Sequence, residues 1–504
     1  MSPTRILTAL LGSLPLLVLI GCAAAQESSP RSENRPPFAF NESDEAFLEE
    51  VQLGCFNYFW NAVDPVTGMV RDRTSVEFIS VAGVGYQLAA MVVGDERGWV
   101  THDQAQERTL QIVRALHANP DNRPGGIFYH FLAPETAGPS GGAYEQVAST
   151  IDSGILFAGL LTVSSHFGGE IGSLADELVA EANWAAFVEK DHEREFEQGF
   201  VSLGWEKPES KPGDESKNEN ASFEDGLLSY TWADAGDEQK LIYFLAQTPP
   251  ESSHRLPPET YYKTRRTLGD VPGEGEVVWF PWSGALFTAF FAHCWIDYAA
   301  MGEDDPGSFD VEHRRPTDWW ENSRRLVQLH RQRATDPERP FKGFGEHVWG
   351  LSACDGEGGY LVPGHFPKLA KEQLGKPQFD HLTIEMEDDW RDGTVAPYTA
   401  GSAIIFEPKA AMDALRHYRE LANEEAPSLW EDPSSGGFGF ADSFRPNEDG
   451  SVEWVAHDRV AIDAGPMLVC IENARTGLIW KTFGRHAFVR KAYGNLGLTP
   501  ARKP

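Results

Sequence analysis

The sequence predicts a mainly α-helical fold, in which paired helices of one large domain close into a toroid. Apolar residues recur at three- and four-residue spacing through most of the chain, as in helices with one buried face. Alternating strand and helix segments, which would indicate a parallel α/β sheet, are not found, and strand-like runs such as 127–131 are short. Because the 504 residues show no repeat of about 34 or 40 residues, a closed toroid is favoured over a solenoid.

The helices are expected in a simple order along the chain. Ser43 and Asp44 are N-cap candidates for the first helix, which buries one face that includes Phe47, Val51 and Cys55. Further helices are expected at 80–93, 102–118, 150–167, 172–192, 236–247, 284–300, 317–333, 407–422 and 464–481. Long loops are expected at 194–235, 248–283, 335–403 and 423–462. Loops of this length inside a compact domain usually carry function, so we expect a cleft at the end where they gather.

The N-terminal residues predict export rather than a folded segment. Arg5 precedes an apolar run, 6–20, that is too short for a comfortable membrane span and is typical of a secretory signal. The run ends at Cys22 in a string that resembles the bacterial lipobox, in which the cysteine is lipidated. An ordinary signal cut near Ala25 is the alternative. We therefore expect a periplasmic or cell-surface lipoprotein, anchored in the outer membrane by its lipid alone.

The domain boundaries follow from this interpretation. Residues 1–21 form the lipoprotein signal peptide, and 22–42, rich in Ser, Pro, Glu and Asn, form a flexible tether. The globular domain is expected at 43–490, followed by a C-terminal tail at 491–504. Four further cysteines lack C-x-x-C spacing, so no zinc site is expected, and buried thiols are favoured over the three possible disulfide pairings. These cysteines are Cys55, Cys294, Cys354 and Cys470.

The composition narrows the class of ligand. Asp and Glu outnumber Lys and Arg by 76 to 43, and the net charge of −33 opposes binding to nucleic acid, anionic headgroups or polyanionic polymers. Phosphate-binding loops, nucleophile elbows and H-E-x-x-H strings are not found in the sequence. We expect no metal or other cofactor, and a neutral oligo- or polysaccharide as the partner. The oligomeric state stays open.

Tryptophans are frequent in the predicted loops. A Trp ring in a loop can stack on the face of a sugar, although it can equally fix the loop to the core. So many of them predict an aromatic-lined cleft. They are Trp205, Trp232, Trp279, Trp282, Trp349, Trp390, Trp430 and Trp454.

Acidic residues recur where helices begin. Asp152 and Glu238 lie in predicted first helical turns and Asp463 comes just before another predicted helix, positions where capping of the helix is the simplest role. Asp152 and Asp463, however, each follow an isoleucine and precede small residues that leave room for a ligand. Glycoside hydrolysis needs two carboxyl groups, one protonated and one ionised, and this set can supply both.

The chain resembles the bacterial glucoamylase-like proteins, which include glycoside hydrolase family 144, the β-1,2-glucanases. The resemblance covers most of residues 45–485. The matching strings are Phe56-Asn57-Tyr58-Phe59-Trp60, Asp72-Arg73, Glu96-Arg97-Gly98-Trp99, Gly126-Ile127-Phe128-Tyr129-His130, Ile151-Asp152-Ser153, His293-Cys294-Trp295-Ile296-Asp297, Trp349-Gly350-Leu351-Ser352-Ala353-Cys354-Asp355 and Ile462-Asp463-Ala464-Gly465-Pro466. The resemblance implies an (α/α)6 toroid and hydrolysis of a β-linked glucan by inversion.

Site roles are carried over from this resemblance position by position. It implies Glu238 as the proton donor, Asp463 as the base that activates water, and Asp152 as a sugar-binding or charge-tuning partner. The string around Glu238 departs from the family's Tyr-Asn-Glu-Ala, and Ala464 replaces a usual Gln. The implied substrate-binding residues are Tyr129, His130, Glu145, His293, Trp295, Trp349 and Asp355.

Two other functions compete with a glycoside hydrolase. A surface lipoprotein that binds glycans without cleaving them would explain the anchor and the altered motifs. A polysaccharide lyase can share the helical toroid, but it acts on uronates and needs basic residues that neutralise them, which this acidic chain offers sparingly. The sequence leaves open the glucan linkage, endo or exo action, and which acid is donor and which is base.

Overall fold

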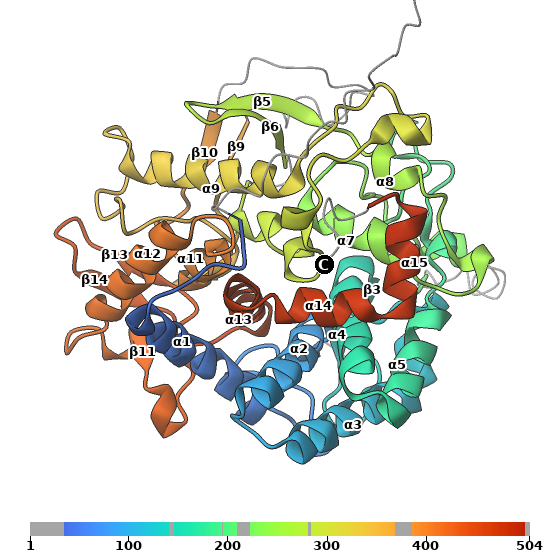
Figure 1. Ribbon diagram of the computed structural model, residues 1–504, viewed down its shortest axis with the longest axis horizontal. Helices are drawn as coiled ribbons and strands as arrows, with labels where there is room; N and C mark the ends of the chain where they lie inside the picture. The colour runs from blue at the N-terminus through green and yellow to red at the C-terminus, as the bar shows by residue number, and fades with distance from the viewer. Residues whose placement is uncertain are drawn as a thin grey trace, which may run out of the picture. The chain divides into compact units, whose positions relative to one another are not determined.

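The computed structural model describes residues 35–140, 146–193, 195–208, 222–280, 284–367 and 386–498. All of them lie in one compact unit, residues 34–504 (Figure 1). The predicted signal peptide, Cys22 and most of the predicted tether lie outside the described residues. Among the described residues, no helix is both long and apolar enough to cross a membrane.

Helices make up most of the regular structure, as predicted. They are α1 (Glu42–Asn61), α2 (Val81–Arg97), α3 (His102–Ala118), α4 (Thr150–Phe167), α5 (Gly169–Glu181), α7 (Asp237–Leu245), α8 (Thr260–Lys263), α9 (Trp319–Thr335), α11 (Pro397–Ala403), α12 (Pro408–Leu421), α13 (Ala461–Arg475), α14 (Leu478–Arg485) and α15 (Ala487–Asn495).

The helices form an inner and an outer layer. Helices α11, α13, α2, α4 and α7 contact one another in that order and form the inner layer (Figure 1). Helix α1 packs on α13, α12 on α11, and α5 on α4, whereas α14 contacts α4, α13 and α2 (Figure 1). The inner helices are buried almost all round, as expected for elements covered on both sides.

Glycines bring the inner helices unusually close. A Cβ on Gly159 of α4 would lie 2.3 Å from the backbone oxygen of Gly85 in α2, so only glycine fits this crossing. A Cβ on Gly465 of α13 would likewise lie 2.1 Å from the ring of Tyr86.

Near the other end of α2, Asp95 contacts His166 at the end of α4, and Arg97 contacts Glu472 late in α13. Earlier residues of the three helices thus meet earlier ones and later residues meet later ones. The three helices are therefore parallel, and their N-terminal turns lie at the same end.

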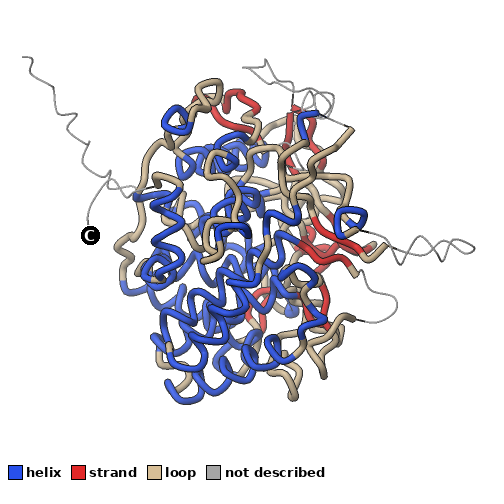
Figure 2. Tube along the Cα trace, turned by 90° about the vertical axis from the view of Figure 1, so that its right-hand side faces the viewer, coloured by secondary structure: helices blue, strands red, loops and turns tan. Residues whose placement is uncertain are grey.

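The strands form seven two-stranded antiparallel pairs in the described residues. They are β1 (Ile79–Ser80) with β2 (Phe131–Leu132), β3 (Val147–Ser149) with β4 (Gly204–Glu206), β5 (Thr267–Val271) with β6 (Gly275–Trp279), β7 (Cys354–Gly356) with β8 (Gly359–Leu361), β9 (Gly364–Pro367) with β10 (Met386–Asp389), β11 (Trp430–Glu431) with β12 (Gly439–Phe440), and β13 (Phe444–Pro446) with β14 (Val452–Val455). Figure 2 shows most strands on one side of the helices. Because β1 and β3 lead directly into α2 and α4, this is the side of the inner N-terminal turns.

Three predicted helices differ from the structure. The segment 284–300 forms short 3-10 turns rather than one α-helix, because its apolar side chains are buried on several sides and lack the single buried stripe that an amphipathic helix needs. The segment 464–481 divides into α13 and α14 at Gly477, whose φ of 69° ends the first helix. The segment 172–192 ends early, and a 3-10 turn at Trp184–Phe187 follows.

The four cysteines of the domain are buried and form no disulfide, as predicted. The Sγ atoms of Cys294 and Cys470 lie 3.8 Å apart. Burial raises the pKa of the Cys55 thiol to about 12, so this side chain stays protonated and acts as a small apolar residue.

Candidate active site

Three acidic residues predicted for the site begin inner helices. Asp463 lies in the first turn of α13, Asp152 in that of α4 and Glu238 in that of α7, which packs against α4. Neither α13 nor α7 has a side-chain N-cap hydrogen bond, and the cap of α4 is Ser149. The N-cap residues of these helices are Val460, Ser149 and Gly236, so none of the three acidic residues is the N-cap of its helix.

Asp463 forms a buried pair with Asp442, a residue that the sequence analysis did not select. The two side chains line one small pocket together with the ring of Tyr398 from the first turn of α11. Asp463 is 3% exposed and Asp442 6%. Within the described part of the chain, no other residue donates a hydrogen bond to Oδ2 of Asp463 or Oδ1 of Asp442, and the two carboxyl groups hydrogen-bond to each other. Two carboxyl groups in this arrangement share a proton, because both cannot be ionised side by side.

Burial and like charge keep a proton on this pair. Burial raises the pKa of Asp463 well above its usual range, and the negative charge of Asp442 raises it further. Burial, assisted by the negative charge of Asp355, also raises the pKa of Asp442 to about 7. The pair therefore titrates as a unit near neutral pH rather than as two ordinary carboxyl groups.

Asp355 connects the pair to an arginine. The Asp355 backbone N–H donates to Oδ2 of Asp442 at 2.7 Å, and its Oδ1 accepts from Nη1 of Arg73 at 2.6 Å. Arg73 also contacts Asp72, with Nε 3.1 Å from Oδ2. One guanidinium thus partly neutralises two carboxylates beside the Asp442–Asp463 pair. The predicted residues Asp355 and Asp463 therefore belong to one cluster, joined through Asp442.

A second cluster surrounds Asp152. Nε2 of His130 lies 3.5 Å from Oδ1 of Asp152, and the Ser149 hydroxyl donates to Oδ2 of the same carboxylate. The His130 side chain is 27% exposed, and its ring stacks on that of Phe131 with the centroids 3.9 Å apart. The backbone explains the contact between His130 and Asp152, since the N–H of His130 donates to the Val147 carbonyl of β3 at 2.8 Å, and β3 leads directly into α4. The structure thus brings together the predicted residues His130 and Asp152.

Glu238 lies at the start of α7, a short helix held by buried contacts. Its side chain is only 7% exposed. The Tyr243 hydroxyl of the same helix donates to the Trp232 carbonyl at 2.7 Å, and Trp232 Nε1 donates to the Thr150 hydroxyl at 2.8 Å. These bonds connect the later part of α7, through the segment that precedes the helix, to the first turn of α4.

Three predicted substrate-binding side chains lie in the core of the described structure. Trp295 and Trp349 are fully buried, and the Trp295 ring stacks on Tyr86. His293 is also buried, and Nε2 lies 3.1 Å from the Ser323 hydroxyl. Burial, together with nearby Lys240, lowers the pKa of His293 to about 3. None of the three rings presents a face to a sugar in this structure. Tyr129 is 9% exposed, and Glu145 lies outside the described residues.

The loop tryptophans fix loops to the core more than they line a cleft. Trp282 lies outside the described residues, and Trp205 and Trp454 are partly exposed. The buried ones are Trp232, Trp279, Trp349, Trp390 and Trp430. The exposed aromatic rings are instead tyrosines, Tyr230 at 60% and Tyr360 at 46%. Tyr360 lies opposite Asp355 in the β7–β8 pair, so it is an aromatic surface beside the acidic cluster.

Comparison with known proteins connects this fold and site to a family. The Glycoamylase ("Putative glucoamylase") family model matches residues 229–487, which is just over half of the chain and includes Glu238, Asp442 and Asp463. The chain belongs to the Glycoamylase family.

A curated relative extends the likeness beyond the matched segment. The exo-β-1,2-glucooligosaccharide sophorohydrolase (non-reducing end) of Parabacteroides distasonis is 25% identical over 480 residues. The alignment covers 89% of this glycoamylase-family chain and 57% of the relative. The chain thus spans a little over half of that relative's length.

Solved structures confirm the helical toroid. The endo-β-1,2-glucanase of Chitinophaga pinensis, solved with sophorotriose and glucose, superposes with a TM-score of 0.69 at 22% identity, covering 91% of this chain and 98% of that one. The β-1,2-glucanase of Parabacteroides distasonis gives a TM-score of 0.68 at 22% identity, covering 91% of this chain and 60% of that one. The predicted (α/α)6 fold is therefore confirmed for this member of the Glycoamylase family.

The sequence of this glycoamylase-family chain does contain a signal for Asp442, the residue that was not predicted. Asp442 follows Phe440 and Ala441 and comes two residues before Phe444, all of them buried. An acid inside such an apolar run is either paired or functional, because a lone buried charge is costly. The run lies in the loop 423–462, which the length argument had already selected as functional.

Proposed function

We propose that this chain is a glycoside hydrolase that cleaves a neutral β-glucan, most readily a β-1,2-glucan. The observation that carries the proposal is the buried Asp442–Asp463 pair at the N-terminal end of the inner helices, with a pKa of about 7 for Asp442. Membership of the Glycoamylase family supports the reaction class, and the β-1,2-specific names of its relatives support the linkage.

The proposed chemistry divides the proton transfers between two carboxyl groups. Glu238 donates its proton to the glycosidic oxygen as the bond to the anomeric carbon breaks. Water attacks that carbon from the opposite face, and the Asp442–Asp463 pair accepts the water proton. A carboxylate pair whose conjugate acid has a pKa near 7 is a stronger base than an ordinary carboxylate and is still ionised near neutral pH. The products are two glucan fragments, with inversion at the new reducing end.

The remaining site residues bind and orient the sugar. His130, held by Asp152, presents a partly exposed ring beside α4. Tyr230 and Tyr360 offer exposed faces on which glucose rings can stack. The charge of the site is suited to a neutral polymer, because the carboxyl groups of Asp72, Asp355, Asp442 and Asp463 outnumber the two arginines beside them, Arg73 and Arg459.

A substrate panel tests the reaction. The purified chain is incubated with β-1,2-, β-1,3- and α-1,4-glucans and with uronate polymers, and released oligosaccharides are separated by chromatography. We expect sophorose-type oligosaccharides from the β-1,2-glucan and little from the others. Ultraviolet-absorbing unsaturated ends from uronates would show a lyase, and saturable binding without products would show a glycan-binding protein. Either outcome would contradict the proposal.

We also propose that the protein is lipidated at Cys22 and anchored at the outer membrane, facing the periplasm or the cell surface. The support is the apolar run 6–20 followed by the lipobox-like string. In a Gram-negative host, the wild-type chain should partition with detergent, whereas Cys22→Ala should be released or mislocalised. Unchanged fractionation and processing of the variant would show that Cys22 is not the anchor.

A further inference from the structure

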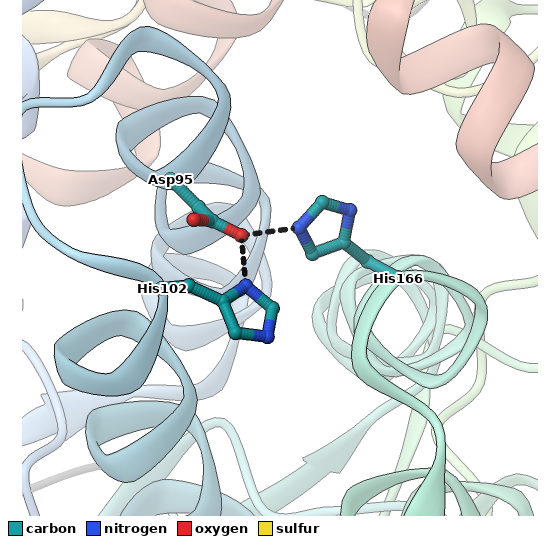
Figure 3. A group of neighbouring side chains, drawn as sticks. All are labelled: Asp95, His102 and His166. Carbon is teal, nitrogen blue, oxygen red and sulfur yellow. Dashed lines mark hydrogen bonds and ion pairs between the residues drawn. The ribbon is translucent and has the colours of Figure 1, made fainter.

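Three side chains from different helices converge far from the acidic pair. Asp95 lies in the last turns of α2, His102 is the first residue of α3, and His166 lies in the last turn of α4 (Figure 3). Nδ1 of His102 lies 2.8 Å and Nε2 of His166 lies 2.7 Å from the same Asp95 oxygen, Oδ2. All three ligand atoms lie within 4.8 Å of one another.

We propose that Asp95, His102 and His166 form a binding site for a divalent transition metal ion, with Zn²⁺ as the best-suited ion. Two imidazole nitrogens and one carboxylate oxygen are ligands that Zn²⁺ prefers, at bond lengths of about 2.0–2.2 Å. Ligand atoms around a tetrahedral ion at these lengths are roughly 3.3 Å apart. The two short separations therefore need to open by only about half an ångström to admit the ion.

The surroundings favour a cation with one open coordination position. The His102 side chain is 57% exposed, so water can supply the fourth ligand, whereas Asp95 and His166 are 12% and 11% exposed and held in place. Asp95 and His166 also lie at helix C-termini, where the backbone dipoles favour positive charge. Oε1 of Glu96 lies 3.9 Å from Nδ1 of His166, on the side where a second carboxylate commonly orients a metal-bound histidine.

The position of the site indicates a structural role. His166 follows Asp152 by fourteen residues along α4, so the two ends are about 21 Å apart. An ion here would link the ends of α2, α3 and α4 and would not contact a sugar at the acidic pair. The proposal rests on these side chains alone and does not depend on the glycosidase function.

Metal titration of the untagged full chain tests the site. The protein is stripped with EDTA, freed of chelator and titrated with Zn²⁺ by calorimetry, and Co²⁺ serves as a spectroscopic probe of coordination number. We expect one ion per chain and a higher melting temperature with Zn²⁺. Because loss of an outer partner alone weakens metal binding about 10–100-fold, His102→Gln should weaken it by at least about 100-fold.

A matched variant separates this site from ordinary surface histidines. His117 lies on the same helix α3, and its Nε2 is 2.9 Å from a single carboxylate oxygen of Glu177. His117→Gln should leave Zn²⁺ affinity unchanged. His102 is exposed, so its replacement should leave the metal-free melting temperature close to the wild-type value. Absence of saturable Zn²⁺ binding, or equal Zn²⁺ affinity of wild-type and His102→Gln, would show that the three side chains only form hydrogen bonds between the helices.

Discussion

Asp463→Asn is expected to lower turnover of β-1,2-glucan by about a hundredfold or more, the usual contribution of general acid–base catalysis. Asparagine keeps the size of the side chain but cannot accept the proton of the attacking water. Asp442→Asn should also lower turnover, since it removes the negative charge that raises the pKa of Asp463 and so makes Asp463 a weaker base. The measurement is kcat and KM on a defined β-1,2-glucooligosaccharide.

The pH profile distinguishes a proton-accepting pair from a binding site. For the wild-type chain, kcat/KM should rise with pH through an apparent pKa near 7, because the pair becomes a base only after it loses its shared proton. In Asp442→Asn this limb should move or disappear. A wild-type profile that is flat between pH 5 and 8 would contradict the role of the pair as base.

As the pH rises through 7, the free energy of unfolding should fall while kcat/KM rises. In the unfolded chain Asp442 ionises near pH 4, whereas in the folded chain it keeps its proton to about pH 7. The folded state therefore binds more protons in this range. Its extra stability is fully present below pH 4, declines as pH rises and is lost above pH 7. The rise of the pKa from 3.8 to about 7 corresponds to at most roughly 4 kcal/mol.

Asp442→Asn should accordingly be more stable than wild-type at pH 8, with a difference that shrinks toward pH 4. The free energy of unfolding from urea titrations at both pH values measures this. Asp64→Asn is a suitable control, because Asp64 is similarly buried and its Oδ1 accepts backbone N–H bonds from Val66 and Thr67 that asparagine can keep. Asp64→Asn should show neither the loss of turnover nor the higher free energy of unfolding at pH 8.

The fold could be predicted because helical periodicity is local information. Helices such as α3 and α9 bury one face, so their apolar spacing marks them directly. The run 284–300 could not be assigned correctly, because its residues are apolar on every side and periodicity carries no signal there. The short α11 was also missed, since its seven residues are all buried and lie inside a long predicted loop.

The candidate site could be predicted only in part. Asp152 and Asp463 were selected because they begin helices, and the fold places those helix starts at the same end of the inner layer. Asp442 belongs to no helix, and its contact with Asp463 depends on the path of the loop 423–462, which spacing does not reveal. The exposure of the aromatic loop residues could not be predicted for the same reason. Whether a loop tryptophan such as Trp349 is buried or a tyrosine such as Tyr360 stays half-exposed is decided by tertiary packing.

Glu238→Gln is expected to lower turnover of β-1,2-glucan by about a hundredfold or more while KM changes little. Glutamine preserves the volume of a side chain that is only 7% exposed, so the start of α7 should remain folded. It cannot protonate the departing glycosidic oxygen. Proton NMR of the first product formed by the wild-type chain should show the inverted anomer, as expected when one carboxyl group acts as acid and another as base across the bond.

The leaving group provides the decisive comparison for this variant. An aryl sophoroside that releases an acidic phenol needs no proton on its leaving oxygen, so Glu238→Gln should cleave it at a rate much closer to wild-type. Equal losses on both substrates would show that Glu238 positions the sugar instead. Near-normal turnover on the glucan would place the acid elsewhere. Asp152 would be the next carboxyl to test, although its two oxygens already contact His130 and Ser149, an arrangement that favours an ionised, orienting carboxylate over a proton donor.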